Sequence, residues 1–328
     1  RGEPDRGDDP YARGPSMTTD GGEGQVSTVV VDCPLCCGPD ADWLHWARDR
    51  WMGGGGAFRY ARCRGCGASY LRIRPSVAAM DRHYPKGYIR TGRGPWWLRS
   101  ALRRLDLAPR ARLATRQPGR RLLDVGCARG DFMVEMRRRG WIVAGVEPTT
   151  WLADEALGRG LVVWPEPVAR APLPAGAFDV ATLWDVLEHL EAPEAALRRV
   201  GAALRPGGRL IVNVPLADGW DARLFGRRWA GWDAPRHLVV FTRATLADTL
   251  RRAGYEVLGT ARVFETYLIT ALSLGLLARE HLPRSVAHLA WAGLHARGTR
   301  LAMVPVFSGL DRVLGPSSLA IVAEWRGR

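Results

Sequence analysis

The chain has 328 residues, of which 47% are hydrophobic and 24% charged, a composition that is typical of globular proteins and excludes a wholly disordered chain. This length suffices for one large α/β domain and a small additional module. The formal net charge of +14 comes almost wholly from arginine, because Lys86 is the single lysine. We interpret this charge as a solvated basic surface, since a nucleic-acid footprint would gather it on one face.

The two ends of the chain differ in composition. Residues 1–27 are polar and rich in Gly, Pro and Asp, so we expect them to be disordered rather than to form a secretory signal. The longest uncharged apolar run has 12 residues, from Tyr267 to Ala278, whereas a helix that spans a bilayer needs about 20. We therefore expect a cytoplasmic protein, in which cysteines bind metal or stay reduced more often than they pair.

Two C-x-x-C pairs in the region 28–75 predict a small zinc module. The pairs are separated by 26 residues and comprise Cys33, Cys36, Cys63 and Cys66. Each pair can form a tight turn whose thiolates face one tetrahedral ion, and a closed shell of four cysteines makes the zinc structural. Gly38 and Gly67 suit the positive φ angles of such turns, and Cys37 stands where glycine is more usual. The strand-like segments "WLHWAR" and "FRYARC" complete a zinc ribbon, with free thiols as the alternative.

The segment 76–118 connects this ribbon to the main domain. We expect one amphipathic helix near Trp96–Leu107 and then a basic linker that Pro118-Gly119 closes. The aromatic residues of this segment pack the ribbon onto the main domain or, alternatively, cap the mouth of the active site.

Strand-like and helix-like segments alternate through the main domain, residues 119–263. The expected strands are "RRLLDVG", "WIVAGVEP", "LVVWPEP", "FDVATLW" and "RLIVNVP". The helices between them are "DFMVEMRRRG", "WLADEALGRG" and "PEAALRRVGAALRPGG", the last of which Pro206-Gly207-Gly208 ends. This alternation predicts an α/β fold with a parallel sheet covered by helices on both faces. Ligands of such sheets bind beyond the carboxyl ends of the strands.

The turn after the first of these strands, in "RLLDVGCARGDF", does not fit a dinucleotide site. Gly126 and Gly130 are four residues apart instead of five, and Ala128 replaces the middle glycine. Asp131 at the start of the following helix would repel a pyrophosphate. The turn therefore favours a cofactor without phosphate.

S-adenosylmethionine fits better, because it carries no phosphate and has a cationic sulfonium that tolerates Asp124 at the strand end. A shallow turn can accommodate the extra methyl group of Ala128 if its φ stays negative. Glu147, at the end of the next strand, can accept hydrogen bonds from both ribose hydroxyls, as acids do at this place in nucleoside sites.

Several motifs together resemble the class I S-adenosylmethionine-dependent methyltransferases. The resemblance is strongest to ubiquinone-biosynthesis methyltransferases and to bacterial sugar and glycan-modifying enzymes, some of which carry a four-cysteine zinc module followed by a "YP..Y" segment. The motifs are "LLDVGCARGDF", "GVEP", "FDVATLWDVLEHL", "ALRPGGRLIVNVP", "RHLVVFTRATLADTLRRAGYEV" and "HYPKGY". The resemblance covers roughly Asp32–Val257, and weakly "SSLAIVAEW" near the end. It implies a Rossmann-like sheet of seven strands with the last one antiparallel.

The resemblance also implies roles for individual residues. It places Asp124, Gly126 and Gly130 in the loop on the methionine side of the cofactor, with Ala128 at the usual glycine position. It makes Glu147 the ribose-binding acid. It places Trp184 and Asp185 along the cofactor after the fourth strand.

The motif "DVLEHL" allows two interpretations. Asp185, Glu188 and His189 are spaced so that one helix face would present all three. Some ubiquinone-type O-methyltransferases bind a divalent metal with a comparable set, but we favour a structural role in which Glu188 and His189 orient the loop. A general base is best supplied by histidine. We place it at His237, in the loop "RWAGWDAPRHLVVFT", with His189 as the second candidate.

The part 264–328 is expected to form a helical lid over the substrate cleft and then the final strand. Its apolar and basic residues alternatively contact a membrane that carries a lipid-linked substrate. The expected function is methyl transfer to carbon or oxygen of a small-molecule, sugar or lipid-linked glycan acceptor. The alternative is a nucleic-acid-binding or RNA-modifying methyltransferase, but the chain lacks an N/D-P-P-Y/F motif after the fourth strand.

Overall fold

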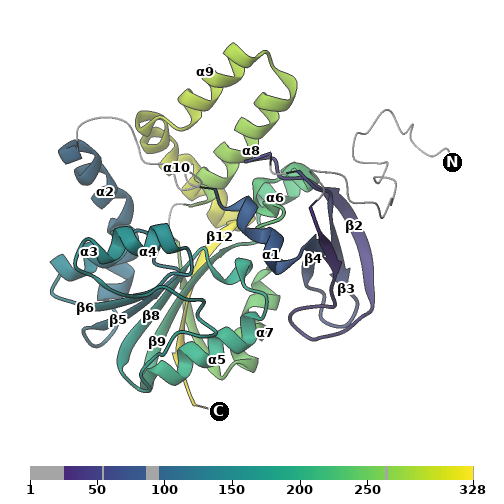
Figure 1. Cartoon of the computed structure of the whole chain (residues 1–328). Coiled ribbons are helices and arrows are strands. Elements are labelled where there is room, and N and C mark those ends of the chain that lie inside the picture. The colour runs from purple at the N-terminus through teal and green to yellow at the C-terminus, as the bar shows by residue number, and fades with distance from the viewer. Residues whose placement is uncertain (1–25, 54, 86–95, 263–264, 328) are drawn as a thin grey trace.

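The computed structural model describes residues 26–53, 55–85, 96–262 and 265–327 (Figure 1). The disorder that the sequence predicts for residues 1–27 therefore concerns mainly residues 1–25, which lie outside the described residues. The same holds for "KGY" in the "HYPKGY" motif.

A seven-stranded sheet forms the centre of the molecule, and its strand order is β11-β12-β9-β8-β5-β6-β7. Five of the strands pair in parallel: β5 (Arg121–Val125), β6 (Ile142–Val146), β7 (Val162–Trp164), β8 (Phe178–Trp184) and β9 (Leu204–Pro215). The last strand, β12 (Ser318–Trp325), runs antiparallel between β9 and β11 (Tyr255–Ala261). The predicted Rossmann-like sheet with an antiparallel last strand is confirmed.

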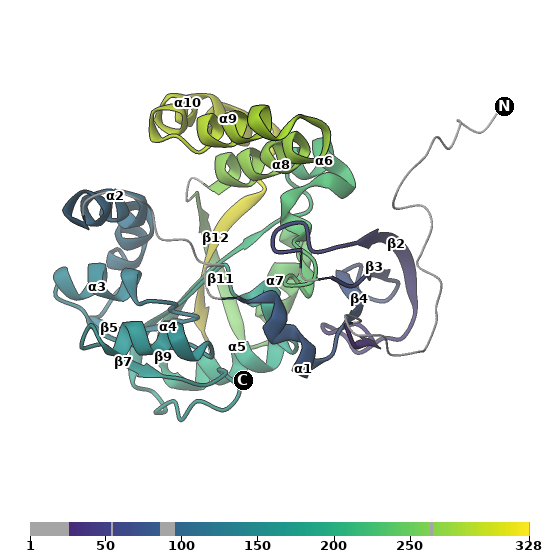
Figure 2. The same ribbon diagram turned by 45° about the horizontal axis from the view of Figure 1, so that its top comes forward.

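Helices cover both faces of this sheet (Figures 1 and 2). One layer consists of α2 (Trp96–Thr115), α3 (Asp131–Arg138) and α4 (Thr150–Leu157), and the other of α5 (Pro193–Ala203) and α7 (Arg243–Arg252). Successive side chains of a strand point to opposite faces. Accordingly, Leu122 packs in the core under the first layer and Leu123 in the core under the second. Helix α2 continues eight residues beyond its predicted end at Leu107, through Pro109, because Ala111 and Ala114 are buried in the same core.

The cysteine-containing region forms a second sheet. Its strands, in the order β1-β4-β3-β2, are β1 (Thr28–Val30), β2 (Ala41–Ala47), β3 (Phe58–Cys63) and β4 (Ser69–Pro75). A strand from the main domain, β10 (Val239–Val240), pairs with β4 and joins this sheet. Short helices α1 (Val77–Met80) and η1 (Asp81–His83) follow β4. The ribbon is thus extended by a strand that comes much later in the chain, beyond β9.

Short helices and a helical excursion lie at the carboxyl end of the parallel strands. Between β9 and β10 the chain forms α6 (Trp220–Phe225), η3 (Gly226–Arg228) and η4 (Ala230–Trp232). Between β11 and β12 it forms α8 (Glu265–His281), α9 (Arg284–Leu294) and α10 (Arg297–Leu314). Because Ser318 pairs with Pro215, the last residue of β9, this excursion departs from the same edge (Figures 1 and 2). Within the described residues, no helix is both long and apolar enough to cross a membrane.

Candidate cofactor and acceptor site

The two glycines of the turn after β5 allow the backbone to pack closely against two different side chains. Gly126 and Gly130 both have a positive φ, of 70° and 73°. A Cβ at Gly126 would lie 2.5 Å from the Val186 side chain, and one at Gly130 would lie 2.2 Å from Leu161. A side chain at either position would therefore displace its neighbours as well as strain the backbone.

Ala128 adopts a φ of 48°, so the turn accommodates it without the negative φ that was set as the condition. The turn is tied to the neighbouring strand, because the Gly126 and Cys127 amides both donate to the Val146 carbonyl, at 2.7 and 3.1 Å. The Ala128 amide donates to the Glu147 carboxylate at 2.9 Å. These bonds hold the alanine in a left-handed conformation that usually favours glycine.

Glu147 lies at the end of β6 and is 5% exposed. Its second carboxylate oxygen accepts a hydrogen bond from the Thr149 amide at 2.8 Å. Burial raises the pKa of Glu147, and the two backbone hydrogen bonds oppose this. Each carboxylate oxygen can accept more than one hydrogen bond, so Glu147 can bind further hydroxyl groups without losing the turn.

Asp124 is 3% exposed in the last residues of β5, and the Thr182 hydroxyl donates to it at 2.7 Å. Burial raises the pKa of Asp124 to about 7. A cation bound beside this carboxyl would favour its charged form.

Trp184 is the last residue of β8, and Asp185 directly follows it. Trp184 packs edge-on against Phe132, with ring centroids 5.5 Å apart, and the Arg110 guanidinium lies 5.1 Å from the Trp184 ring. Asp185, with a φ of 57°, accepts hydrogen bonds from Arg110 at 3.0 Å and from Asn213 at 2.8 Å. Sequence reasoning missed Arg110 and Asn213, although a polar Asn213 near the end of the apolar segment "RLIVNVP" was a usable signal.

The prediction that Asp185, Glu188 and His189 share one helix face was wrong. After β8 the chain forms only the short helix η2 (Leu187–His189), and Asp185 precedes it with a left-handed backbone. Asp185 therefore turns to Arg110, whereas Glu188 and His189 meet His237. One ligand atom from each of these three residues lies within 4.8 Å of the others.

Of the two histidines of this cluster, His237 is buried and His189 is half-buried, and their ring centroids are 4.8 Å apart. His237 Nδ1 is 2.8 Å from the Gly231 carbonyl, and His189 Nδ1 is 2.9 Å from the Arg236 carbonyl. Because a carbonyl only accepts, His237 Nδ1 carries a proton. His189 Nδ1 also lies 3.1 Å from the Tyr84 hydroxyl, which can donate or accept. The unprotonated nitrogen of neutral His237 is then Nε2, which lies 3.9 Å from Glu188 Oε1.

Burial lowers the pKa of both histidines. It lowers that of His189 to about 3, with the neighbouring His237 as the next cause. The pKa of His237 is also lowered by burial, but the nearby Asp233 carboxylate opposes this. His237 is therefore the better placed of the two to accept a proton near neutral pH.

Comparison with known protein families identifies the domain that holds this site. The family model described as a methyltransferase domain matches residues 98–260. The chain carries a class I S-adenosylmethionine-dependent methyltransferase domain.

The chain is similar to curated proteins of two kinds, ubiquinone biosynthesis O-methyltransferases and a probable S-adenosylmethionine-dependent methyltransferase. It is 32% identical to the ubiquinone biosynthesis O-methyltransferase of Aeromonas salmonicida (strain A449) over 103 residues, which are 29% of this chain and 43% of that protein. It is 28% identical to a probable S-adenosylmethionine-dependent methyltransferase of Mycolicibacterium smegmatis over 192 residues, which are 55% of this chain and 70% of that protein. The chain thus spans less than half the length of the ubiquinone-biosynthesis relative.

Among solved structures, an S-adenosylmethionine-dependent methyltransferase from Mesorhizobium loti is 18% identical, with a TM-score of 0.46. The match covers 67% of this chain and 97% of that chain.

A buried ion network joins the ribbon to the histidine cluster. Arg236 is fully buried and bonds both oxygens of Asp49, each at 2.9 Å, and both oxygens of Asp233, at 2.6 and 3.0 Å. His83 Nδ1 lies 2.9 Å from Asp49, and the His83 carbonyl accepts from Arg236 at 3.2 Å. Asp49 follows β2, whereas Arg236 directly precedes His237. Sequence reasoning missed this network.

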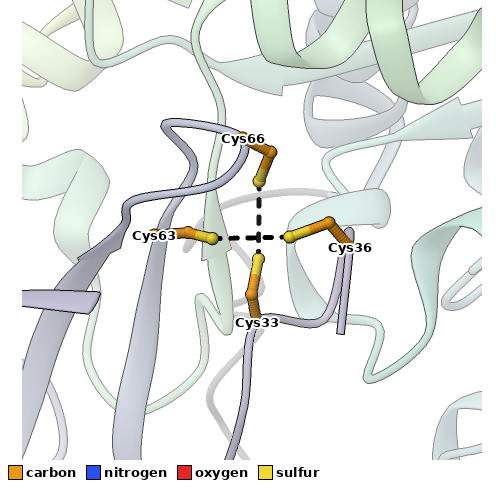
Figure 3. Close-up of side chains that lie close together, drawn as sticks. All are labelled: Cys33, Cys36, Cys63 and Cys66. Carbon is orange, nitrogen blue, oxygen red and sulfur yellow. Dashed lines mark hydrogen bonds between the residues drawn. The ribbon is translucent and has the colours of Figure 1, made fainter. Parts of the chain in front are cut away.

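The four cysteines of the ribbon point toward one another, as Figure 3 shows. The Sγ atoms of Cys33 and Cys66 are 3.6 Å apart and those of Cys36 and Cys63 are 3.4 Å apart. Four thiolates around zinc at about 2.3 Å form a tetrahedron whose edges are about 3.8 Å, so this donor set fits zinc. Gly67 has the expected positive φ of 74°, but in the first turn Cys37, not Gly38, takes the positive φ, of 57°. Cys37 is exposed and does not belong to the cluster.

Proposed function

We propose that this protein transfers the methyl group of S-adenosylmethionine to an oxygen or carbon atom of a small-molecule acceptor. The single observation that carries the proposal is the juxtaposition of two features at the carboxyl end of the sheet. One is the glycine turn tied to Glu147, and the other is the buried histidine cluster around His237. The methyltransferase family and its ubiquinone-biosynthesis relatives support the same chemistry.

The residues of the turn suit each part of this cofactor. Gly126, Ala128 and Gly130 would let the backbone pass close to the methionine part, with the Asp124 carboxylate balancing positive charge. Glu147 would accept hydrogen bonds from the ribose hydroxyls. Trp184 and Asp185 would line the cofactor beside the turn. S-adenosylmethionine supplies an electrophilic methyl group, and its sulfur keeps the bonding electron pair as a neutral thioether when the methyl leaves.

The histidine cluster would supply the base that an oxygen or carbon acceptor requires. The acceptor proton would pass to His237 Nε2 as the acceptor atom forms its bond to the methyl carbon. Glu188 and Asp233 each place an oxygen 3.9 Å from that nitrogen, and their negative charge would stabilise the imidazolium that results. His189 would serve as the second candidate for the base. A sugar or lipid-linked glycan is our more specific proposal for the acceptor.

We also propose that Cys33, Cys36, Cys63 and Cys66 hold a structural zinc ion. With four protein ligands the ion would have no open position for chemistry. Its role would be to fix the two turns that carry β2, β3 and β4. The alternative function of the protein, nucleic-acid binding or RNA modification, finds no support among the relatives.

Isothermal titration calorimetry with S-adenosylmethionine tests the cofactor site. We expect Glu147→Ala to weaken binding by about 1–3 kcal/mol, or about 5- to 150-fold, through lost charged hydrogen bonds. The matched control is Glu166→Ala, which removes an exposed carboxylate just beyond β7. Equal affinity in the Glu147 variant and the wild type would remove this residue from the site.

A further inference from the structure

A hollow lies between the ribbon and the loop that precedes His237. It is bordered by β2 and the residues after it, by residues 227–234 and by Leu276 of α8, and the space of about 490 Å³ between them includes open solvent. Four arginines and four tryptophans line it. Neither the cofactor turn nor the histidine cluster contributes to its lining.

The hollow is strongly positive. Arg48, Arg227 and Arg228 are exposed, and Asp233 is the one acidic residue among the described residues that line it. That carboxylate is bound to the buried Arg236. Burial and the charge of Arg227 lower the pKa of His45, another lining residue, to about 4.

Two buried polar atoms at the hollow have no hydrogen-bond partner among the described residues. Arg50 bonds Glu280 and the Arg228 carbonyl through Nε and Nη1, but its Nη2 is buried and unbonded. The Nε2 atom of His45 is also buried and unbonded. Buried polar groups are rarely left unsatisfied, so a ligand or ordered water that reached either of these atoms would stabilise it.

The hollow adjoins the histidine cluster. Asp233 lines the hollow and places its Oδ2 atom 3.9 Å from His237 Nε2. Trp232, which also lines it, has a carbonyl that accepts a hydrogen bond from Tyr60, whose hydroxyl also contacts the His237 carbonyl at 2.9 Å. Asp233 therefore forms a wall that the hollow shares with the histidine cluster.

We propose that the hollow binds a phosphate or diphosphate ester that belongs to the methyl acceptor. Guanidinium groups bind phosphate oxygens in a bidentate manner, and several together balance a multivalent anion better than a single one does. The tryptophans offer flat apolar surfaces to the ring or sugar that the ester carries. This inference rests on the proposed function, because it takes the acceptor to react at the histidine cluster.

Calorimetric titration of the full chain with inorganic pyrophosphate and with uridine diphosphate tests the proposal. The double variant Arg48→Gln/Arg227→Gln should bind both probes at least about tenfold more weakly than the wild type. The control Arg223→Gln removes an exposed arginine of α6 outside the hollow and should bind them as the wild type does. Equal affinity in the double variant, or equal loss in the control, would overturn the proposal.

A second arm distinguishes the source of the phosphate. The probes are vesicles of phosphatidylcholine with and without phosphatidic acid, examined by flotation. Flotation that needs phosphatidic acid and Arg48 and Arg227, without binding of the soluble diphosphates, would assign the site to a lipid-linked ester. Binding of the soluble diphosphates alone would assign it to a soluble one, and binding of neither would refute the site.

S-adenosylmethionine affinity is measured on the same variants and should not change. If the phosphate proposal is wrong, cofactor binding and methyl transfer are still observed. If the proposed function is wrong, methyl transfer is not observed, whereas the diphosphates still bind.

Discussion

Replacing Asp49 with asparagine tests whether the ribbon positions the histidine cluster. Asp49 and Arg236 are joined by two hydrogen bonds of 2.9 Å, and both side chains are fully buried. Removing one partner of such a pair leaves an incompletely compensated buried charge and costs about 3–5 kcal/mol. Because Arg236 keeps Asp233 and the introduced amide retains the shape of the carboxylate, we expect the lower end of that range, about 3 kcal/mol.

The same substitution should lower turnover. The Arg236 carbonyl accepts the hydrogen bond that orients His189, and His237 is the next residue. A shift of this peptide would move both rings while leaving the cofactor turn in place. We therefore expect S-adenosylmethionine affinity to stay unchanged while kcat falls.

The assay combines urea unfolding, calorimetry and methyl transfer, each measured against Asp42→Asn. Asp42 pairs with Arg64 on the exposed side of the same ribbon, so its loss should change nothing measurable. Burial opposes the ionisation of Asp49, but Arg236 and the further hydrogen bonds hold its pKa at about 2. The depressed pKa means that this stabilisation is present above about pH 4 and is lost as the pH falls through about 2. An Asp49 variant with wild-type stability and turnover would refute the reasoning.

Three further predictions concern the site itself. We expect His237→Ala to keep the affinity for S-adenosylmethionine but to lower turnover by about 100-fold, and near-normal turnover would transfer the role to His189 or to no base. Because burial raises the pKa of Asp124 to about 7, affinity for the cationic cofactor should rise as the pH increases through that value, and Asp124→Asn should abolish the dependence in calorimetric titrations. Metal analysis should find one zinc per chain that Cys63→Ser removes; zinc-free protein with an intact ribbon would contradict the four-cysteine site.

The sheet could be predicted because its signal is local. Apolar strands such as "RLLDV" and helices that end at glycine each report their own conformation, and their alternation is enough to predict a parallel sheet. The antiparallel β12 carries no such signal. It follows a long helical excursion, and only the resemblance to known methyltransferases indicated its place.

The histidine cluster was predicted in part, and the reason is geometric. The spacing of Asp185, Glu188 and His189 predicts a shared face only if a helix continues through them. The left-handed backbone at Asp185 starts a tight turn instead, so the helix is three residues long and the cluster gains His237 in place of Asp185. Likewise, the sterics of Ala128 alone favour a negative φ, and the hydrogen bonds of the turn to the Val146 carbonyl and the Glu147 carboxylate override that preference.

The pairings that join the ribbon to the site could not be read from the sequence, since each connects residues far apart in the chain. Asp49 and Arg236 are 187 residues apart. Likewise, nothing in the sequence of β10 or of β4 indicates that the two strands pair. All of these contacts converge on residues 227–241, which form one wall of the arginine-lined hollow, hold the candidate base and complete the sheet of the ribbon. A change in the cysteine turns would therefore reach the histidines through β4 and β10. From this arrangement we infer that the ribbon helps to shape the acceptor site, and that removing the proposed zinc ion would lower methyl transfer before it affects the cofactor turn between β5 and β6.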